Sequence, residues 1–212
     1  MKPKISIDID DVVADSTEAL RILVNQRVGA ALTADDYRGV GGEYWGYYER
    51  VWRNHGIQDR VSFKELSAEM AADQSHVLLL PGAEVAIHQL AQWFHVVFIT
   101  SRDKSWEVAT RKWFQKQFSH DDIELYFCES HKDARAKTKG QLCKELGVTL
   151  HIDDNEAHCQ SVLDEGIAAI LFGRYGWHDG SAKGVVVCAD WSEVMDYIGK
   201  AYGDADKTRE EN

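Results

Sequence analysis

The stretch that decides the fold runs from Ile5 to Asp15 and reads ISIDIDDVVAD. Its apolar residues predict a buried strand, which brings Asp8 and Asp10 to the point where the strand ends. Residues i and i+2 of a strand share a face, so both carboxylates are expected to point the same way. Two like charges this close repel each other, and a hard divalent cation such as Mg2+ relieves that repulsion. The alternative is a strand followed by ordinary turn aspartates. The motifs further along the chain distinguish a metal site from such a turn.

Length, composition and charge restrict the class of protein. The 212 residues suit one domain, or a core domain that carries a smaller insertion. No apolar run reaches the length of a membrane span and no signal-peptide pattern opens the chain, so we expect a soluble, cytoplasmic protein without a membrane partner. The net charge of −11 argues against a nucleic-acid polymer as partner, because such binding is led by Lys and Arg contacts to phosphate.

Strand-like and helical patterns alternate along most of the chain. The helical patterns lie at 82–94, 104–118, 137–147 and 155–166. This alternation implies right-handed crossovers and a mainly parallel sheet with helices on both faces. We therefore predict an α/β fold with a Rossmann-like parallel sheet and a site at the carboxyl ends of its strands. The predicted strands are 5–9, 95–100, 124–128, 149–152 and 168–172.

Residues 16–80 interrupt the alternation because they read as helices only. Thr33 is a candidate helix N-cap, and Ser62 with Glu65 has the spacing of a capping box. This segment is inserted after the first strand and is long enough for a small helical subdomain over the strand ends. The predicted organisation is an α/β core of residues 1–15 and 81–212 with a helical cap of residues 16–80.

Three further groups of polar residues follow predicted strands or open a helix. Residues 100–102 are Thr-Ser-Arg, which offer two hydroxyls and a guanidinium to an anion. A helix that opens near 137–140 carries two lysines, and residues 153–154 form a second pair of carboxylates. Each group alone is ordinary, as a helix cap, a solvated lysine or a turn. Together with the first acidic pair, in this order at successive strand ends, they predict a combined metal and phosphate site.

In this order the motifs resemble those of the haloacid dehalogenase (HAD) superfamily of phosphotransferases. The insertion is similar to that family's helical C1 cap. The residues of the motifs look most like those of the 5′(3′)-deoxyribonucleotidases and their bacterial relatives. The resemblance implies a hydrolase, a Mg2+-dependent phosphatase acting on a small phosphorylated substrate. The four motifs fall on Asp8-x-Asp10, Thr100, Lys139 and Asp153-Asp154.

The resemblance also implies a catalytic role for particular side chains. Asp8 would be the nucleophile and form an aspartyl-phosphate that water then hydrolyses. Asp10 would protonate the leaving oxygen and then deprotonate the water. Thr100, the amide of Ser101 and Lys139 would balance the charge on the phosphoryl oxygens.

Mg2+ is the cofactor that the resemblance implies. One carboxylate oxygen of Asp8, the backbone carbonyl of Asp10 and the carboxylate of Asp154 would hold the ion. Asp153 would then support the motif-three lysine or the water molecules on the metal.

Two positions depart from the family pattern or leave it ambiguous. Asp11 stands where many members have Gly, so the turn after the nucleophile is expected to differ locally. Lys137 and Lys139 both lie near the start of the third motif's helix, and Lys139 is preferred because its offset to Asp154 matches the common form of the motif.

The insertion is rich in aromatic side chains, which suggests how a substrate is recognised. An aromatic ring stacks on a nucleobase with roughly 1–3 kcal/mol. The alternative is that a small helical cap needs its rings for its own core, and we expect this for more than half of them. Arg102 is expected either to contact a polar group of the substrate outside the phosphate or to form a surface salt bridge. The candidates for reading a base are Tyr44, Trp45, Tyr48 and Trp52.

The favoured function is that of a 5′-nucleotidase acting on (deoxy)nucleoside monophosphates. One rival is a phosphatase for sugar phosphates or other small metabolites. The other is a catalytically silent, phosphate-binding regulatory module on the same fold. The presence of both Asp8 and Asp10 argues against the silent module, because binding alone requires no acid or base at i+2.

Overall fold

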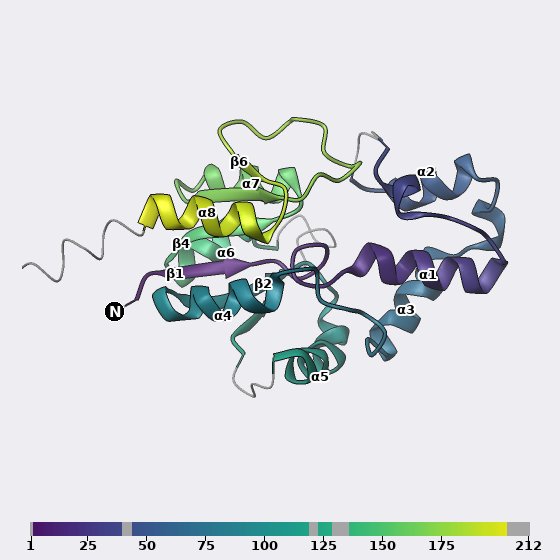
Figure 1. The fold of residues 1–212 in the computed structure, drawn as a ribbon, viewed down its shortest axis with the longest axis horizontal. Coiled ribbons are helices and arrows are strands. Elements are labelled where there is room, and N and C mark those ends of the chain that lie inside the picture. The colour runs from purple at the N-terminus through teal and green to yellow at the C-terminus, as the bar shows by residue number, and fades with distance from the viewer. Residues whose placement is uncertain (1, 40–43, 119–122, 129–135, 203–212) are drawn as a thin grey trace, which may run out of the picture.

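A parallel sheet lies at the centre of the computed structural model, which describes residues 2–39, 44–118, 123–128 and 136–202. The sheet has six strands in the order β3-β2-β1-β4-β5-β6, and each pair of neighbours is parallel. The predicted α/β, Rossmann-like architecture is therefore confirmed (Figure 1). The strands are β1 Lys4–Ile7, β2 His95–Thr100, β3 Leu125–Phe127, β4 Val148–Asp153, β5 Ala168–Phe172 and β6 Val186–Cys188.

Helices cover both faces of the sheet. Ile5 and Ile7 of β1 belong to a large apolar cluster that includes residues of α4, α5 and α8. Val97 and Ile99 of β2 belong to a second cluster with residues of α6 and α7 on the opposite face. The helices of these two layers are α4 Ala83–Trp93, α5 Glu107–Phe118, α6 Lys139–Leu146, α7 Glu156–Leu163 and α8 Trp191–Tyr202.

The first strand is shorter than predicted and ends at Ile7 instead of Ile9. After Asp8 the chain enters a tight turn, in which the backbone oxygen of Ile9 accepts from the amides of Val13 and Ala14. These local bonds replace a further bond to a neighbouring strand. The prediction that Asp8 and Asp10 share one face of a strand is therefore wrong, and their carboxylates have different partners.

The remaining elements lie close to their predicted positions. β2 and β5 have the predicted bounds, whereas the segment predicted as one helix over 104–118 begins with a 3-10 helix, η3, at Lys104–Trp106. β6 and α8 were not predicted. β6 is only three residues long and gives no clear periodicity. None of the described helices is long and apolar enough to cross a membrane.

The insertion at residues 16–80 is helical in the part that the structure describes, and it lies beyond the end of β1 (Figure 1). Thr33 forms the capping box of a 3-10 helix with Asp36, and Ser62 accepts from the amide of Glu65 at the start of α3. Its elements are α1 Ser16–Val28, η1 Ala34–Tyr37, α2 Tyr47–Asn54, η2 Gln58–Arg60 and α3 Phe63–Ala72.

Gly140 is where α6 meets α7, and its replacement tests this close packing. A Cβ atom added at Gly140 would lie 1.9 Å from the backbone oxygen of Ser161. We expect Gly140→Ala to lower the free energy of unfolding by about 1–3 kcal/mol in urea denaturation, because backbone cannot yield as a flexible side chain can. Gly199→Ala in α8 is the control, since no heavy atom lies within 4 Å of its added Cβ. Equal effects of the two substitutions would contradict this packing.

Candidate active site

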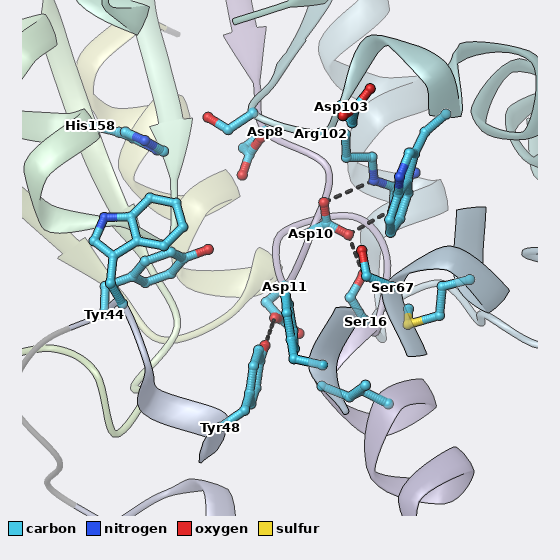
Figure 2. A pocket seen from close by; sticks show the side chains of 16 residues that line it. Asp8, Asp10, Asp11, Ser16, Tyr44, Tyr48, Ser67, Arg102, Asp103 and His158 are labelled. Carbon is cyan, nitrogen blue, oxygen red and sulfur yellow. Dashed lines mark hydrogen bonds and ion pairs between the residues drawn. The ribbon is translucent and has the colours of Figure 1, made fainter. Parts of the chain in front are cut away.

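A pocket of about 310 Å³ opens at the carboxyl ends of the central strands. Its floor carries Asp8, Asp10, Ser101 and Arg102, and the helical insertion supplies much of its wall. Figure 2 shows Asp8 and Asp10 projecting from the loop after β1, with Tyr44 and Tyr48 on the side of the insertion. Of the predicted site residues, the cavity is lined by Asp8, Asp10, Ser101 and Arg102 of the core and by Tyr44, Trp45 and Tyr48 of the insertion, whereas Thr100, Lys139, Asp153, Asp154 and Trp52 do not line it.

Lys139 lies at the first position of α6 and is fully buried. Thr138 caps this helix through a reciprocal capping box with Gln141, which fixes the direction in which the lysine leaves the backbone. The Nζ atom of Lys139 lies 2.8 Å from Oδ1 of Asp8 and 2.7 Å from Oδ2 of Asp153. Burial opposes the charge, but the two carboxylates prevail and raise the pKa of Lys139 above its ordinary value.

Lys137 takes no part in this cluster. Its side chain is 60% exposed and forms an ion pair of 2.7 Å with Glu145 on the surface of α6. Of the two lysines, only Lys139 contacts Asp8, so Lys139 is the one that occupies the site.

Asp153 holds Lys139 in place and has both carboxylate oxygens occupied. Oδ2 accepts from Lys139 and from His151, at 2.7 and 2.8 Å. Oδ1 accepts from the amide of Asn155 at 2.9 Å and lies 3.3 Å from Nδ1 of His158. Burial favours the neutral acid, yet Lys139 and the histidine contacts lower the pKa of Asp153 well below its ordinary value. This carboxylate is therefore a charged partner of the lysine.

Asp8 and Asp154 are the carboxylates best placed for a metal. Asp8, Asp153 and Asp154 each offer an oxygen, and these atoms all lie within 4.8 Å of one another. Burial, together with Asp153, raises the pKa of Asp8 to about 7 and that of Asp154 well above its ordinary value. Buried carboxylates so close together favour a cation, and hard oxygen donors suit Mg2+. Both oxygens of Asp153 already have hydrogen-bond partners, so Asp8 and Asp154 fit a metal better than Asp153 does.

The predicted phosphate-binding hydroxyls differ in their surroundings. Thr100 is buried at the end of β2, and its Oγ1 accepts from the amide of Arg102 at 3.1 Å, so it shapes the turn. Ser101 lines the pocket, and its buried Oγ has no hydrogen-bond partner in the described part of the chain. A buried hydroxyl that faces a cavity without a partner fits a site for an oxyanion.

Asp10 is bound on both oxygens by Arg102. The Nε and Nη2 atoms of Arg102 donate to Asp10 over 2.8 and 2.7 Å, and Ser16 adds a further short hydrogen bond. Burial disfavours the carboxylate, but Arg102 more than offsets this and lowers the pKa of Asp10. Arg102 also donates to Gln74 and Thr110, over 2.9 and 3.1 Å. Arg102 is therefore buried and hydrogen-bonded to three side chains beside the pocket. The expectation that it forms a surface salt bridge is wrong.

Asp11 has a backbone conformation that usually requires glycine. Its φ of 54° lies in the left-handed region, which Asp tolerates better than most residues. The carboxylate accepts from the amide of Thr17 at 2.9 Å and from its hydroxyl at 2.7 Å, which ties the turn to the start of α1. Burial raises the pKa of Asp11 to about 7. The left-handed turn is thus formed without glycine.

The aromatic side chains of the insertion divide between pocket and core. Tyr44, Trp45 and Tyr48 line the pocket. Trp52 does not: it is 1% exposed, and its Nε1 donates to the hydroxyl of Tyr37 at 3.0 Å inside the insertion. The prediction that Trp52 faces the substrate is wrong, because this ring serves the insertion's own core.

The loop after β5, residues 173–178, packs against the aromatic wall of the pocket, although none of its residues lines the cavity. The ring of Trp177 lies 6.0 Å from that of Tyr44, and its Nε1 donates to the backbone oxygen of Asp154. Tyr175 donates to the backbone oxygen of Asp11 at 2.5 Å. The same loop therefore supports the second acidic pair and the aromatic wall. Its dense aromatic composition was the available signal.

Several other pocket residues were also missed. They carry no motif, and their positions depend on how the insertion folds back over the strand ends. The polar residues Ser16 and His158 had local signals, since one follows the first acidic motif and the other the second. The pocket residues not predicted as site residues include Ser16, Leu20, Phe63, Ser67, Met70, Trp106 and His158.

Comparisons with known proteins find solved structures with a similar fold but no similar sequence family. No protein-family model and no curated protein sequence matches this chain. A HAD family hydrolase from Deinococcus radiodurans R1, solved with bound phosphate and sodium, has 16% identity and a TM-score of 0.63, with 94% of this chain and 96% of that chain covered.

Two further solved structures agree over nearly their full length. A haloacid dehalogenase-like protein of unknown function from Agrobacterium tumefaciens str. C58 has 14% identity and a TM-score of 0.63, with coverage of 95% and 99%. A HAD-hydrolase from Bacillus subtilis bound to magnesium has 12% identity and a TM-score of 0.59, with coverage of 93% and 99%. The chain is similar to these proteins in fold, and that fold is the one found in HAD hydrolases.

Proposed function

We propose that this protein is a Mg2+-dependent phosphomonoester hydrolase that acts through an aspartyl-phosphate on Asp8. The observation that carries the proposal is the buried Asp8 carboxylate, which lies beside Asp154 and 2.8 Å from the ammonium group of Lys139. Such an arrangement gives a nucleophile on the cavity floor, with a place for a cation and a fixed positive charge directly beside it. Solved structures of the same fold with bound phosphate and with magnesium support the proposal.

The metal would be held by Asp8, Asp154 and the backbone carbonyl of Asp10. When bound, Mg2+ would supply positive charge that keeps Asp8 ionised and balances the phosphate. This matters because burial raises the pKa of Asp8 to about 7. Only the ionised carboxylate is a nucleophile.

In the first half-reaction, a carboxylate oxygen of Asp8 attacks the phosphorus atom of the substrate. The new O–P bond forms as the bond from phosphorus to the leaving oxygen breaks, and a protonated Asp10 supplies the proton to that oxygen. Lys139 and the hydroxyl of Ser101 balance charge on the phosphoryl oxygens. The products are an alcohol and the aspartyl-phosphate.

In the second half-reaction, Asp10 removes a proton from water as the water oxygen attacks phosphorus. The acyl-phosphate O–P bond breaks, which releases inorganic phosphate and restores Asp8. The Arg102 contacts favour the ionised form of Asp10 and so suit it to act as a base. They oppose its protonation, so substrates with poor leaving groups should be the slow ones.

The helical insertion would act as the cap of the site and select a flat, uncharged group on the substrate. Tyr44, Trp45 and Tyr48 present rings to the same cavity as Asp8, and stacking on a base is worth roughly 1–3 kcal/mol per ring. We therefore propose a 5′-nucleotidase acting on (deoxy)nucleoside monophosphates. The net charge of −11 favours such a small substrate over a nucleic-acid polymer, and a cytoplasmic location stays a prediction from the sequence.

Replacing the nucleophile tests the covalent mechanism. Asp8→Asn should lower kcat for phosphate release by orders of magnitude, because the amide cannot attack phosphorus. The fold should persist in urea denaturation, because Lys139 keeps Asp153 as its charged partner. Asp10→Asn should lose less activity on 4-nitrophenyl phosphate, a good leaving group, than on a nucleotide. Asp59→Asn, on the exposed η2, is the control. Wild-type turnover in Asp8→Asn would refute the mechanism and favour a silent binding module.

Metal binding can be tested without turnover by isothermal titration calorimetry. Asp154→Ala should weaken Mg2+ binding at least about tenfold, as the loss of a ligand or of its support does in other metal sites. Asp164→Ala, an exposed carboxylate at the end of α7, is the matched control and should leave the affinity unchanged. Unaltered Mg2+ affinity in Asp154→Ala would remove this residue from the metal site.

A pair of tryptophans on the insertion tests the substrate class. Trp45→Ala should raise KM for deoxynucleoside 5′-monophosphates about tenfold with kcat nearly unchanged, because stacking is common to ground and transition states. KM for ribose 5-phosphate should not change. Trp52→Phe is the control and should lower stability without altering KM, since Trp52 is buried behind the rings of Tyr48 and Phe63 and does not itself line the pocket. Preference for sugar phosphates, or equal losses on both substrates, would reject the nucleotidase and leave the phosphatase chemistry intact.

A further inference from the structure

Two polar side chains lie buried in the sheet directly behind the proposed site. Ser6 and His151 face each other in the register between β1 and β4, and neither is accessible to solvent. Each lies two residues before a carboxylate of the site, Ser6 before Asp8 and His151 before Asp153. The strand neighbours of Ser6 and His151 belong to the apolar cluster on the opposite face of the sheet. A serine and a histidine at such positions are not required for packing.

The hydrogen bonds of this pair have one consistent direction. Burial lowers the pKa of His151, so the ring is neutral and has one donor and one acceptor nitrogen. Asp153 is ionised and only accepts, so Nε2 of His151 donates to its Oδ2 over 2.8 Å. Nδ1 then accepts from the hydroxyl of Ser6 over 2.7 Å, and the thiol of Cys143 lies 3.4 Å from the same hydroxyl as the remaining donor. The chain of bonds therefore selects one tautomer of His151.

This chain ends on the oxygen that holds the lysine. Oδ2 of Asp153 accepts both from His151 and from Lys139, while Asn155 and His158 are bound to Oδ1. The carboxylate is thus fixed from both sides and cannot rotate without breaking hydrogen bonds in a buried, low-dielectric place. His151 and Lys139 therefore share one oxygen of Asp153.

We propose that Ser6 and His151 are positioning residues, which orient Asp153 and through it place Lys139 beside Asp8 and the phosphate. Neither residue touches the substrate. The inference rests on the proposed function, because it assigns Lys139 to the phosphate. An apolar pair would fill the same space without the cost of burying a hydroxyl and an imidazole, so the polar pair contributes geometry more than stability.

A double-mutant cycle on ligand binding tests this assignment. The variants are His151→Leu, Lys139→Met and their combination, and the probe is inorganic phosphate titrated calorimetrically in the presence of Mg2+. We expect His151→Leu to weaken phosphate binding about tenfold in the wild-type background, as loss of supporting partners does at metal sites. It should have no further effect in the Lys139→Met background, because its influence passes through the lysine.

Two conservative variants separate positioning from packing. His151→Gln retains an N–H group that can donate to Asp153 and should recover phosphate affinity and kcat to within threefold of wild type. Ser6→Ala removes the hydroxyl that donates to Nδ1 of His151, so the ring is held by Asp153 alone, and it should give an intermediate loss. Val97→Ala is the matched control, because Val97 is buried on the same sheet beside Ser6. It should lower the urea midpoint and leave phosphate affinity unchanged.

Two results would overturn the inference. One is equal weakening by His151→Leu in both backgrounds. The other is wild-type phosphate affinity in a folded Ser6→Ala or His151→Leu protein. Failure of the proposed function looks different, since wild type would then release no phosphate from any substrate while the cycle on phosphate binding could still be read.

Discussion

The ammonium group of Lys139, buried between Asp8 and Asp153, is the interaction on which the rest of the site depends. Removing one partner of a buried ion pair typically costs about 3–5 kcal/mol, because a charge is left without compensation. The three groups come from α6, β4 and the loop after β1, so their pairing requires the parallel sheet and the capped start of α6 together. It also leaves Asp154 and one side of Asp8 for a cation.

A second ion pair, between the buried Arg102 and the partly exposed Asp10, connects the site to the helical insertion. Arg102 binds Asp10 on one side and Gln74 on the other, and Gln74 lies in the segment that returns from the insertion to the core. Tyr48 of the insertion approaches Thr17 at the start of α1, within 2.8 Å between hydroxyl oxygens. Arg102 therefore joins Asp10, the proposed acid and base, to the segment that leads from the insertion back to the core.

The order of strands and helices, and the residues at the strand ends, could be read from the sequence because periodicity and motif spacing are local. Lys139 could be preferred over Lys137 because its offset to Asp154 matches the motif of the family that the chain resembles. The Asp10–Arg102 pair could not, since it joins residues 92 positions apart. Trp52 and Trp45 are similar in sequence context, and only the folded insertion shows that one ring is buried and the other lines the pocket. Ser6 and His151 carried a signal, as polar residues inside apolar strands.

The most direct test of the central claim is chemical trapping of the intermediate. Wild-type protein is mixed with substrate and Mg2+, quenched within one turnover and treated with borohydride, which reduces an acyl-phosphate to an alcohol. Peptide mass spectrometry then locates the product. A covalent mechanism at Asp8 predicts homoserine at position 8, dependent on substrate and absent in Asp8→Asn. Rapid turnover with an unmodified Asp8, or with the modification on another carboxylate, would contradict the assignment of Asp8 as nucleophile.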